Sequence, residues 1–345
     1  MSLADFDYEL PPEAIAQTPL AERDSARLLV DGGPGRAPSH RRVTDLPELV
    51  GPGDVIVVND SRVLAARLRL RKPTGGAAEV LLLQPHGADG PCWEALVRSS
   101  GRIAPGTRLT GTDSDGGLTV DVGAELGEGT RLVRLFEGGQ PVTSVPATLE
   151  RHGEVPLPPY IHEPLGQPER YQTVYADRPG SVAAPTAGLH LTADVLDRCR
   201  AAGARVERVD LAVGLGTFRP IAVARVAEHR MHAERYRVAP EVLAACRSAH
   251  RVLAVGTTTV RALESAAATG ACEGSTDLFI RGEHAFAVVD VLLTNFHVPR
   301  SSLLVLVEAF VGPRWRRLYE IALAEGYRFL SFGDAMLLQR DRAER

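Results

Sequence analysis

The hydrophobic pattern at the start of the chain points to a buried strand. An unbroken run of β-branched residues fills positions 55–58, and polar residues follow at once in Asn59 and Asp60. Such a run predicts a strand that is covered on both faces and ends in polar groups. Open α/β sheets place their sites at this carboxyl end, so we expect a site here.

The pattern changes between about residue 65 and residue 136. Short strand-like runs cover residues 78–84, 92–98, 118–122 and 130–136, separated by Gly and Pro and without a helical pattern between them. Several short strands at this spacing are typical of a small barrel or sandwich.

Helical and strand patterns alternate again after a Pro-rich link at residues 155–161. We expect helices over residues 192–202, 240–250, 257–269 and 313–324, and strands over residues 204–213, 251–255 and 303–307. The chain thus predicts an α/β fold: a mixed α/β sandwich domain over residues 1–62 and 151–345, interrupted by an inserted small all-β barrel domain over residues 63–150. A length of 345 residues suits two domains of roughly 150 residues.

Composition and charge exclude several classes of protein. Hydrophobic residues make up 44% and charged residues 24%, as in a folded globular chain. The net charge of -4 gives no global basic field for nucleic acid, although a local patch remains open. The four cysteines are dispersed and form no metal-binding pair, which favours a reducing compartment and no metal site. The start has no export signal, and the apolar stretch at residues 301–312 is too short to cross a bilayer, so we expect a cytoplasmic protein.

Two glycine-containing loops follow predicted strands. Gly256, Thr257 and Thr258 stand at a strand end and a helix start, where free N–H groups and the helix dipole bind a carboxylate or a phosphate. Simple helix capping is the alternative there. The second loop resembles half of a dinucleotide fingerprint, but Arg219 stands where a third glycine is needed. A turn that requires positive φ explains it equally well; its candidate residues are Gly214, Gly216, Thr217 and Phe218.

Three further segments carry candidate acids and bases. If residues 232–238 form a strand, His232 and Glu234 share one face and suit proton transfer, with a buried structural pair as the alternative. Thr186 and His190 end one constrained loop, and Asn295 and His297 end another. Each loop alone is an ordinary turn, but together with Asn59, Asp60 and Arg62 they bring donors, acceptors and bases from several strand ends. This convergence favours a site.

The motifs, taken in order, resemble one family, the S-adenosylmethionine:tRNA ribosyltransferase-isomerases of queuosine biosynthesis. The resemblance spans nearly the whole chain and rests on residues 5–11, 53–62, 156–161, 170–176, 181–190, 213–218, 229–234, 254–265, 290–299 and 327–336.

The resemblance implies an α/β enzyme with an inserted β-barrel that acts on tRNA carrying 7-aminomethyl-7-deazaguanine at the wobble position. Such an enzyme transfers the ribosyl part of S-adenosylmethionine to that amine, rearranges it to an epoxycyclopentane, and releases adenine and methionine. The product is epoxyqueuosine-tRNA. S-adenosylmethionine is then a co-substrate, no separate cofactor is implied, and we expect a monomer without membrane association.

The chemistry assigns roles to the candidates. A sulfonium acidifies the ribose C5′ hydrogens, so a base near that carbon starts ring opening; the candidates are His190, His232, Glu234 and His297, and the sequence does not rank them. Asp60 or Asp334 can protonate the departing adenine if burial raises its pKa. Arg261 with the amides of residues 257–258 suits the methionine carboxylate, and Glu264 or Glu308 suits the cationic groups. The other expected substrate contacts are Asn59, Arg62, Thr186, Gly214, Gly216, Thr217, Phe218, Gly256 and Asn295.

A basic segment near the β insertion is the candidate tRNA contact. On a strand, Arg67, Arg69 and Arg71 share a face, and Lys72 follows them. An ordinary solvated face is the alternative.

The chain departs from the family pattern at several positions, including Asp210, Ala212 and Arg281. These departures leave many of the candidate donor-binding loops intact. Two alternatives to the main hypothesis follow: a divergent enzyme that passes the ribosyl fragment to a small nucleoside or amine, and a non-catalytic RNA-binding relative.

Overall fold

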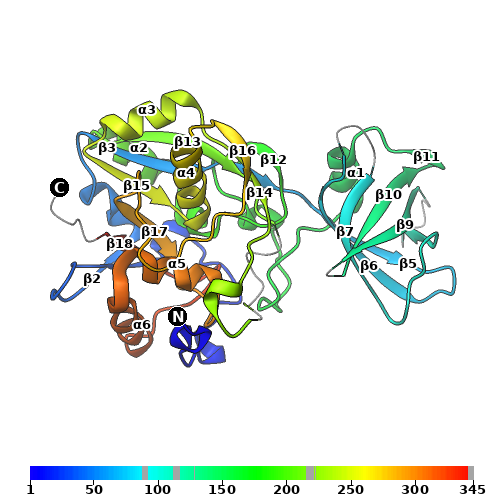
Figure 1. Cartoon of the computed structure of the whole chain (residues 1–345), viewed down its shortest axis with the longest axis horizontal. Coiled ribbons are helices and arrows are strands. Elements are labelled where there is room, and N and C mark those ends of the chain that lie inside the picture. The colour runs from blue at the N-terminus through cyan, green and yellow to red at the C-terminus, as the bar shows by residue number, and fades with distance from the viewer. Residues whose placement is uncertain (88–91, 112–116, 128, 215–220, 222, 341–345) are drawn as a thin grey trace. The chain divides into compact units, whose positions relative to one another are not determined.

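The computed structural model describes residues 1–87, 92–111, 117–127, 129–214, 221 and 223–340, and it contains two compact units (Figure 1). The first unit comprises Met1–Arg62, Pro158–Arg178 and Ala184–Arg345, and the second comprises Val63–Leu157 and Pro179–Ala183. Each unit is therefore assembled from segments that are separated in the sequence.

A nine-stranded sheet forms the centre of the first unit. Its strands, in spatial order, are β16 (Glu273–Thr276), β14 (Glu234–Arg237), β13 (Arg205–Leu211), β3 (Asp54–Asn59), β15 (Arg251–Val255), β17 (Val291–Asn295), β18 (Ala335–Gln339), β1 (Arg27–Val30) and β2 (Ser39–Arg42). All six residues of β3 are buried, as the β-branched run predicts. The strand expected over residues 251–255 is β15.

The strand directions bring several chain segments to one edge of this sheet. β13, β3, β15 and β17 are mutually parallel, so their carboxyl ends lie at the same edge. β18 runs antiparallel to β17, which places Ala335 opposite Asn295, and β1 runs parallel to β18. The beginnings of β18 and β1 therefore lie at this same edge, which we call the carboxyl edge.

The α-helices described in the first unit are α2 (Ala193–Ala201), α3 (Pro240–Ser248), α4 (Thr257–Thr269), α5 (Ser302–Val311) and α6 (Trp315–Ala324). α4 packs against β13, β3 and β15, and Figure 1 shows it beside these strands. Leu28, Ile56 and Leu293 of the sheet pack with Leu191 and Val195 in one buried cluster. Burial of this apolar cluster stabilises the sheet, and the sheet positions the polar residues of the carboxyl edge.

The prediction of a strand over residues 303–307 is wrong, because this segment lies within helix α5. Ser301 caps the helix, its hydroxyl accepting a hydrogen bond from the Leu304 N–H at 3.2 Å. Leu304, Val305, Leu306 and Val307 are all buried, so the helix shows no polar face in this turn. A short run that is apolar all round cannot be assigned to strand or helix by periodicity.

The second unit contains a seven-stranded antiparallel sheet. Its order is β11 (Gln140–Pro141), β10 (Thr130–Glu137), β7 (Cys92–Ser99), β6 (Ala77–Pro85), β5 (Arg67–Arg71), β8 (Arg108–Gly111) and β9 (Leu118–Gly127). β9, the last strand in this order, also pairs with β10, the second. The helix α1 (Val145–His152) follows, and two short strands, β4 (Ser61–Val63) and β12 (Arg178–Ser181), form a separate pair.

No helix in the described part of the chain is long and apolar enough to cross a bilayer.

Candidate active site

A pocket of about 350 Å³ lies at the carboxyl edge of the nine-stranded sheet. Its walls come from the segments that follow β13, β15 and β17 and from a loop that ends in a 3₁₀ helix over Thr186–His190. We call it the edge pocket; its lining residues are Ala184, Pro185, Thr186, Ala187, Val213, Gly256, Thr257, Thr258, Thr294, Asn295, His297 and Leu303. Five residues expected at a substrate site, Thr186, Gly256, Thr257, Thr258 and Asn295, and one expected base, His297, thus lie together.

Helix α4 begins at this pocket. Gly256 precedes it with φ of 89°, a conformation in which a side chain would be strained. No side chain caps the helix, and Thr257 and Thr258 of its first turn line the pocket. The free N–H groups and the positive end of the helix dipole therefore suit a carboxylate or a phosphate.

Asn59, the last residue of β3, holds the start of α4 through hydrogen bonds. Its amide nitrogen donates to the Leu211 carbonyl at 3.0 Å and to Thr258 Oγ1 at 3.2 Å, while its oxygen accepts from the Leu211 N–H at 3.1 Å. The side chain is fully buried. Asn59 therefore ties the ends of β3 and β13 to the first turn of α4, which accounts for its polar groups without a ligand.

Asn295 links the edge pocket to His190. Its Nδ2 donates to the Leu330 carbonyl at 3.1 Å and to His190 Nε2 at 2.9 Å, and its Oδ1 accepts from the Thr186 hydroxyl at 2.9 Å. A carbonyl oxygen only accepts, so the Leu330 contact fixes which end of the amide is nitrogen. His190 Nε2 is then an acceptor, and the ring proton of the neutral imidazole sits on Nδ1.

Burial keeps His190 neutral. Burial, together with the charges of Arg328 and Arg23, lowers the pKa of His190 to about 4. Because its Nε2 lone pair already accepts from Asn295, a neutral His190 offers a donor rather than a free base.

His297 is held in the wall of the edge pocket by both its ring and its backbone. Its Nε2 lies 2.9 Å from the Thr294 hydroxyl. The Tyr319 hydroxyl accepts from the His297 N–H at 3.0 Å, and Tyr8 donates to the His297 carbonyl. Burial lowers the pKa of His297 to about 3, so the ring is neutral at physiological pH. Among the described residues nothing hydrogen-bonds Nδ1, which makes it the free nitrogen of this imidazole.

Asp60 follows β3 and is a buried carboxylate with one unsatisfied oxygen. Its Oδ1 is enclosed without a hydrogen-bond partner in the described part of the chain, and its Oδ2 lies 3.9 Å from Arg178 Nε. Burial raises the pKa of Asp60 to about 6; Arg178 opposes the shift, and Asp210 adds to it. A carboxyl group that acts as the proton donor needs a pKa raised by burial, and Asp60 has one.

Asp334, the other candidate donor, joins two backbone segments. One carboxylate oxygen accepts from the Arg27 N–H and the other from the Arg328 N–H, both at 2.8 Å. Burial raises its pKa, but both oxygens are used to hold the start of β1 against the 328–334 loop. Its contacts describe a structural role.

Arg261, Glu234 and Glu264, which were expected in substrate and base roles, are engaged in contacts inside the fold. Arg261 Nη1 forms a buried ion pair with Glu234, and its other nitrogens donate to the Leu278 and Thr276 carbonyls. Glu234 also accepts from the Gly214 N–H at 2.8 Å. Glu264 accepts from three consecutive N–H groups, at residues 287–289. These contacts account for the three buried charges without a ligand.

Replacing Glu234 by glutamine tests that interpretation. We expect the free energy of unfolding to fall by about 3–5 kcal/mol, because the variant leaves the buried Arg261 charge without its counter-ion. Thermal melting measures the change, with Glu273→Gln as the control, since Glu273 forms only an exposed pair with Arg237. If the folded variant instead melts like the wild type but has lost turnover, Glu234 belongs to the reaction centre.

The remaining expected residues lie apart from the edge pocket or outside the described residues. His232 is exposed and precedes β14, whereas Glu234 is buried within that strand, so the expected shared face does not include His232. Arg62 forms a surface pair with Glu169. Glu308 lies in α5; one of its oxygens is buried without a hydrogen-bond partner among the described residues, and burial raises its pKa. Gly216, Thr217 and Phe218 fall outside the described residues. Among those described, no group of three or more His, Cys, Asp or Glu side chains is placed to hold a metal.

Sequence reasoning missed three residues that shape the site. Thr294 contacts the His297 ring, and Tyr8 and Tyr319 hold its backbone. Thr294 stands three positions before His297 and was visible as a hydroxyl at a strand end. Tyr8 and Tyr319 lie 289 and 22 residues from His297, and no local pattern signals such contacts.

Comparisons with known proteins agree on one family. The model of a family described as "Queuosine biosynthesis protein" matches residues 3–338. A Rubrobacter xylanophilus S-adenosylmethionine:tRNA ribosyltransferase-isomerase is 51% identical over 340 residues, with 98% of each chain covered. The Thermus thermophilus protein of the same name is 51% identical over 352 residues, covering 97% of this chain and 99% of that one. The crystal structure of a Thermotoga maritima S-adenosylmethionine tRNA ribosyltransferase superimposes with a TM-score of 0.53 at 33% identity, covering 96% and 99%; this likeness supports the mixed α/β class.

Proposed function

The chain belongs to the queuosine biosynthesis family of S-adenosylmethionine:tRNA ribosyltransferase-isomerases, and we propose that the edge pocket is its reaction centre. The observation that carries this proposal is the free Nδ1 of the buried, neutral His297 in a pocket that also holds the N-terminus of α4. A base and an anion-binding helix end thus line the same hollow.

The substrate in this proposal is tRNA that carries 7-aminomethyl-7-deazaguanine at the wobble position. S-adenosylmethionine supplies the ribosyl group, and the products are epoxyqueuosine-tRNA, adenine and methionine. The new bond joins the acceptor amine to the rearranged ribosyl carbon skeleton, and the bonds to adenine and to sulfur break. Two protein groups are needed, one to take a proton from C5′ and one to give a proton to adenine.

His297 is the base in this scheme. The sulfonium acidifies C5′, and Nδ1 accepts the proton if Nε2–H donates to Thr294 Oγ1, an arrangement that leaves the Nδ1 lone pair free. The electron pair stays on carbon as an ylide and drives ring opening. His190 then acts as a neutral donor beside the pocket, because Asn295 occupies its Nε2.

Asp60 is the proposed acid. Burial raises the pKa of Asp60 to about 6, so a fraction of the carboxyl groups is protonated near neutral pH and can protonate adenine as it leaves. The methionine carboxylate rests on the amides of Thr257 and Thr258 at the start of α4. Arg261 takes no part, since Glu234 and two carbonyls hold it.

The experiment that tests this function is incubation with S-adenosylmethionine and modified tRNA. Adenine release together with labelling of the tRNA supports the proposal. Release only with a small nucleoside or amine acceptor would favour the divergent enzyme, and binding without turnover would favour the non-catalytic relative. Identity of about 50% over the whole length of proteins named as ribosyltransferase-isomerases favours the first outcome.

The second unit is the proposed RNA-binding module. Since β9 pairs with β10, we infer that strands β5–β10 close into a small barrel, the inserted domain expected from the sequence. In β5 the side chains of Arg67, Arg69 and Arg71 alternate with buried Leu68 and Leu70, so the arginines share a face.

The cations of β5 and of Lys72, which follows it, are not equivalent. Arg67 lies 3.7 Å from Glu79, and Arg69 lies 2.9 Å from Glu154, so carboxylates offset both charges. Arg71 donates instead to the Gly75 carbonyl and Lys72 to the Ser100 carbonyl, which are uncharged. Arg71 and Lys72 therefore retain the charge that a phosphate would meet.

Replacing both Arg71 and Lys72 by glutamine is expected to weaken tRNA binding and to flatten its salt dependence. Each lost phosphate contact lowers the slope of log K against log salt by about 0.7–0.9, so the double variant should lose about 1.5. Filter binding at several salt concentrations measures this. Arg108→Gln serves as the control, because Arg108 is already paired with Asp121. An unchanged slope in the double variant would remove these residues from the RNA contact.

We further propose that the protein works as a cytoplasmic monomer with S-adenosylmethionine as co-substrate and no separate cofactor.

A further inference from the structure

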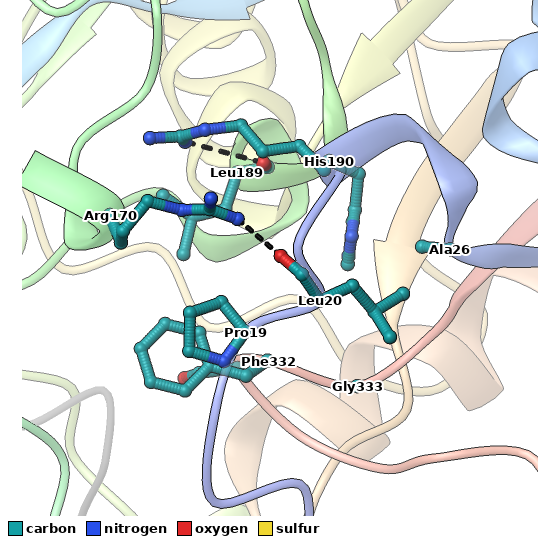
Figure 2. A pocket seen from close by; sticks show the side chains of 10 residues that line it. Pro19, Leu20, Ala26, Arg170, Leu189, His190, Phe332 and Gly333 are labelled. Carbon is teal, nitrogen blue, oxygen red and sulfur yellow. Dashed lines mark hydrogen bonds between the residues drawn. The ribbon is translucent and has the colours of Figure 1, made fainter. Parts of the chain in front are cut away.

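A second hollow of about 290 Å³ lies in the first unit (Figure 2). Its walls include Arg23, Arg170, His190, Ser331 and Phe332, and we call it the arginine pocket. We propose that the arginine pocket binds a backbone phosphate of the RNA substrate. This inference rests on the proposed function, because it names a subsite for the tRNA.

Neutral backbone oxygens hold both guanidinium groups in place. Arg23 donates to the carbonyls of Gln172 at 2.6 Å, Glu169 at 2.9 Å and Leu189 at 3.4 Å. Arg170 donates to the carbonyls of Leu20 and of Ala21. These bonds orient two cations without neutralising them, and within the described ranges neither arginine forms an ion pair. The carboxylate of Glu169 acts on Arg23 only from a distance, and it is itself 75% exposed and paired with Arg62.

Two buried donors near this pocket have no acceptor. Arg170 Nε and Arg328 Nη1 are enclosed and make no hydrogen bond within the described part of the chain. Arg328 lies close enough to His190 to lower its pKa, so its charge reaches the same pocket. A buried N–H without an acceptor destabilises the fold, and an oxyanion in the pocket would supply the missing acceptor.

The lining favours a phosphate of RNA over the methionine end of S-adenosylmethionine. That end carries a cationic ammonium and a cationic sulfonium beside its carboxylate, and no residue lining the pocket is acidic. A phosphate brings negative charge alone. Figure 2 shows the Arg170 guanidinium and the His190 ring reaching into the same space, with Pro19 and Phe332 forming an apolar side.

The position of the pocket also suits a nucleotide next to the modified base. His190 lines the arginine pocket and bonds Asn295, which lines the edge pocket. The hydrogen bond between His190 and Asn295 thus connects the wall of the phosphate subsite to the wall of the proposed reaction centre.

The test compares Arg170→Gln with Arg317→Gln, which removes the same charge from an exposed site on α6 paired only with Glu320. Wild-type adenine release with modified tRNA is measured first, because its absence would refute the proposed function rather than the subsite. We expect Arg170→Gln to weaken tRNA binding about tenfold and to lower the salt slope by about 0.7–1, and to change the KM for S-adenosylmethionine less than twofold. Arg317→Gln should bind like the wild type.

Two outcomes overturn the subsite. If Arg170→Gln raises the KM for S-adenosylmethionine and leaves tRNA affinity unchanged, the pocket takes the methionine carboxylate. If both quantities match those of Arg317→Gln, the pocket binds neither.

A measurement on the wild type keeps the test valid even if the variant does not fold. Inorganic phosphate should weaken tRNA binding more than chloride at equal ionic strength, because it competes for the arginine pocket. An equal effect of the two salts contradicts the proposal.

Discussion

Replacing His297 by alanine is expected to slow adenine release from S-adenosylmethionine about 100- to 10,000-fold at saturating tRNA. The loss follows from the removal of the Nδ1 lone pair, the proposed acceptor of the C5′ proton. Single-turnover kinetics with S-adenosylmethionine labelled in the adenine ring measures the step directly. Binding of S-adenosylmethionine should change little, because the helix end at Thr257 and Thr258 remains.

Two control variants make the His297 result specific. His162→Ala removes an exposed imidazole outside both pockets and should retain wild-type turnover. His190→Ala should lower the rate less than His297→Ala, because its Nε2 is already occupied by Asn295. If His297→Ala turns over at the wild-type rate while His190→Ala is inactive, the base is His190 and the proposed tautomer is wrong.

The structure separates four candidate bases that the sequence left equal. Glu234 forms a buried ion pair with Arg261, and His232 is exposed and precedes β14. His190 Nε2 accepts a hydrogen bond from the Asn295 amide. Only His297 of the four lines the edge pocket. The ranking comes from hydrogen-bond partners, which are contacts between segments distant in the chain.

Local pattern was sufficient where one segment determines the outcome. The β-branched run over residues 55–58 has to be buried on both faces, and it is the central strand β3. The glycine followed by hydroxyls at residues 256–259 predicts the strand-to-helix corner between β15 and α4, and that corner lines the edge pocket. Parallel strands bring such ends together, so the meeting of these segments at one edge of the sheet was predictable.

Local pattern does not show which partner a charged side chain meets across the fold. Arg261 and Glu264 read as ligand-binding side chains because both follow a glycine corner. In the fold Arg261 meets Glu234, 27 residues away, and Glu264 meets amides 23 to 25 residues away. Nothing in a single segment distinguishes a buried charge that binds substrate from one that joins α4 to its neighbours.

Asp60→Asn is expected to remove the acid step and with it the high-pH limb of the rate profile. Burial raises the pKa of Asp60 to about 6, so the protonated fraction falls about tenfold for each pH unit above that value. The wild-type kcat/KM for adenine release should fall with the same slope. At pH 6 the variant should be about 100- to 10,000-fold slower, and its remaining rate should not fall as the pH increases from 6 to 8.

The same shift predicts an opposite effect on stability. The pKa of Asp60 is higher in the folded chain than the ordinary value of 3.8, so its contribution to stability is complete below that value and is lost as the pH rises through about 6. At pH 8 the wild type therefore carries a buried, ionised carboxylate that Asp60→Asn lacks, and the variant should melt at a higher temperature. Asp197→Asn, at an exposed pair on α2, should change neither property. A variant that is slower but keeps the wild-type pH profile would show that another group protonates adenine, because only the acid itself sets that limb.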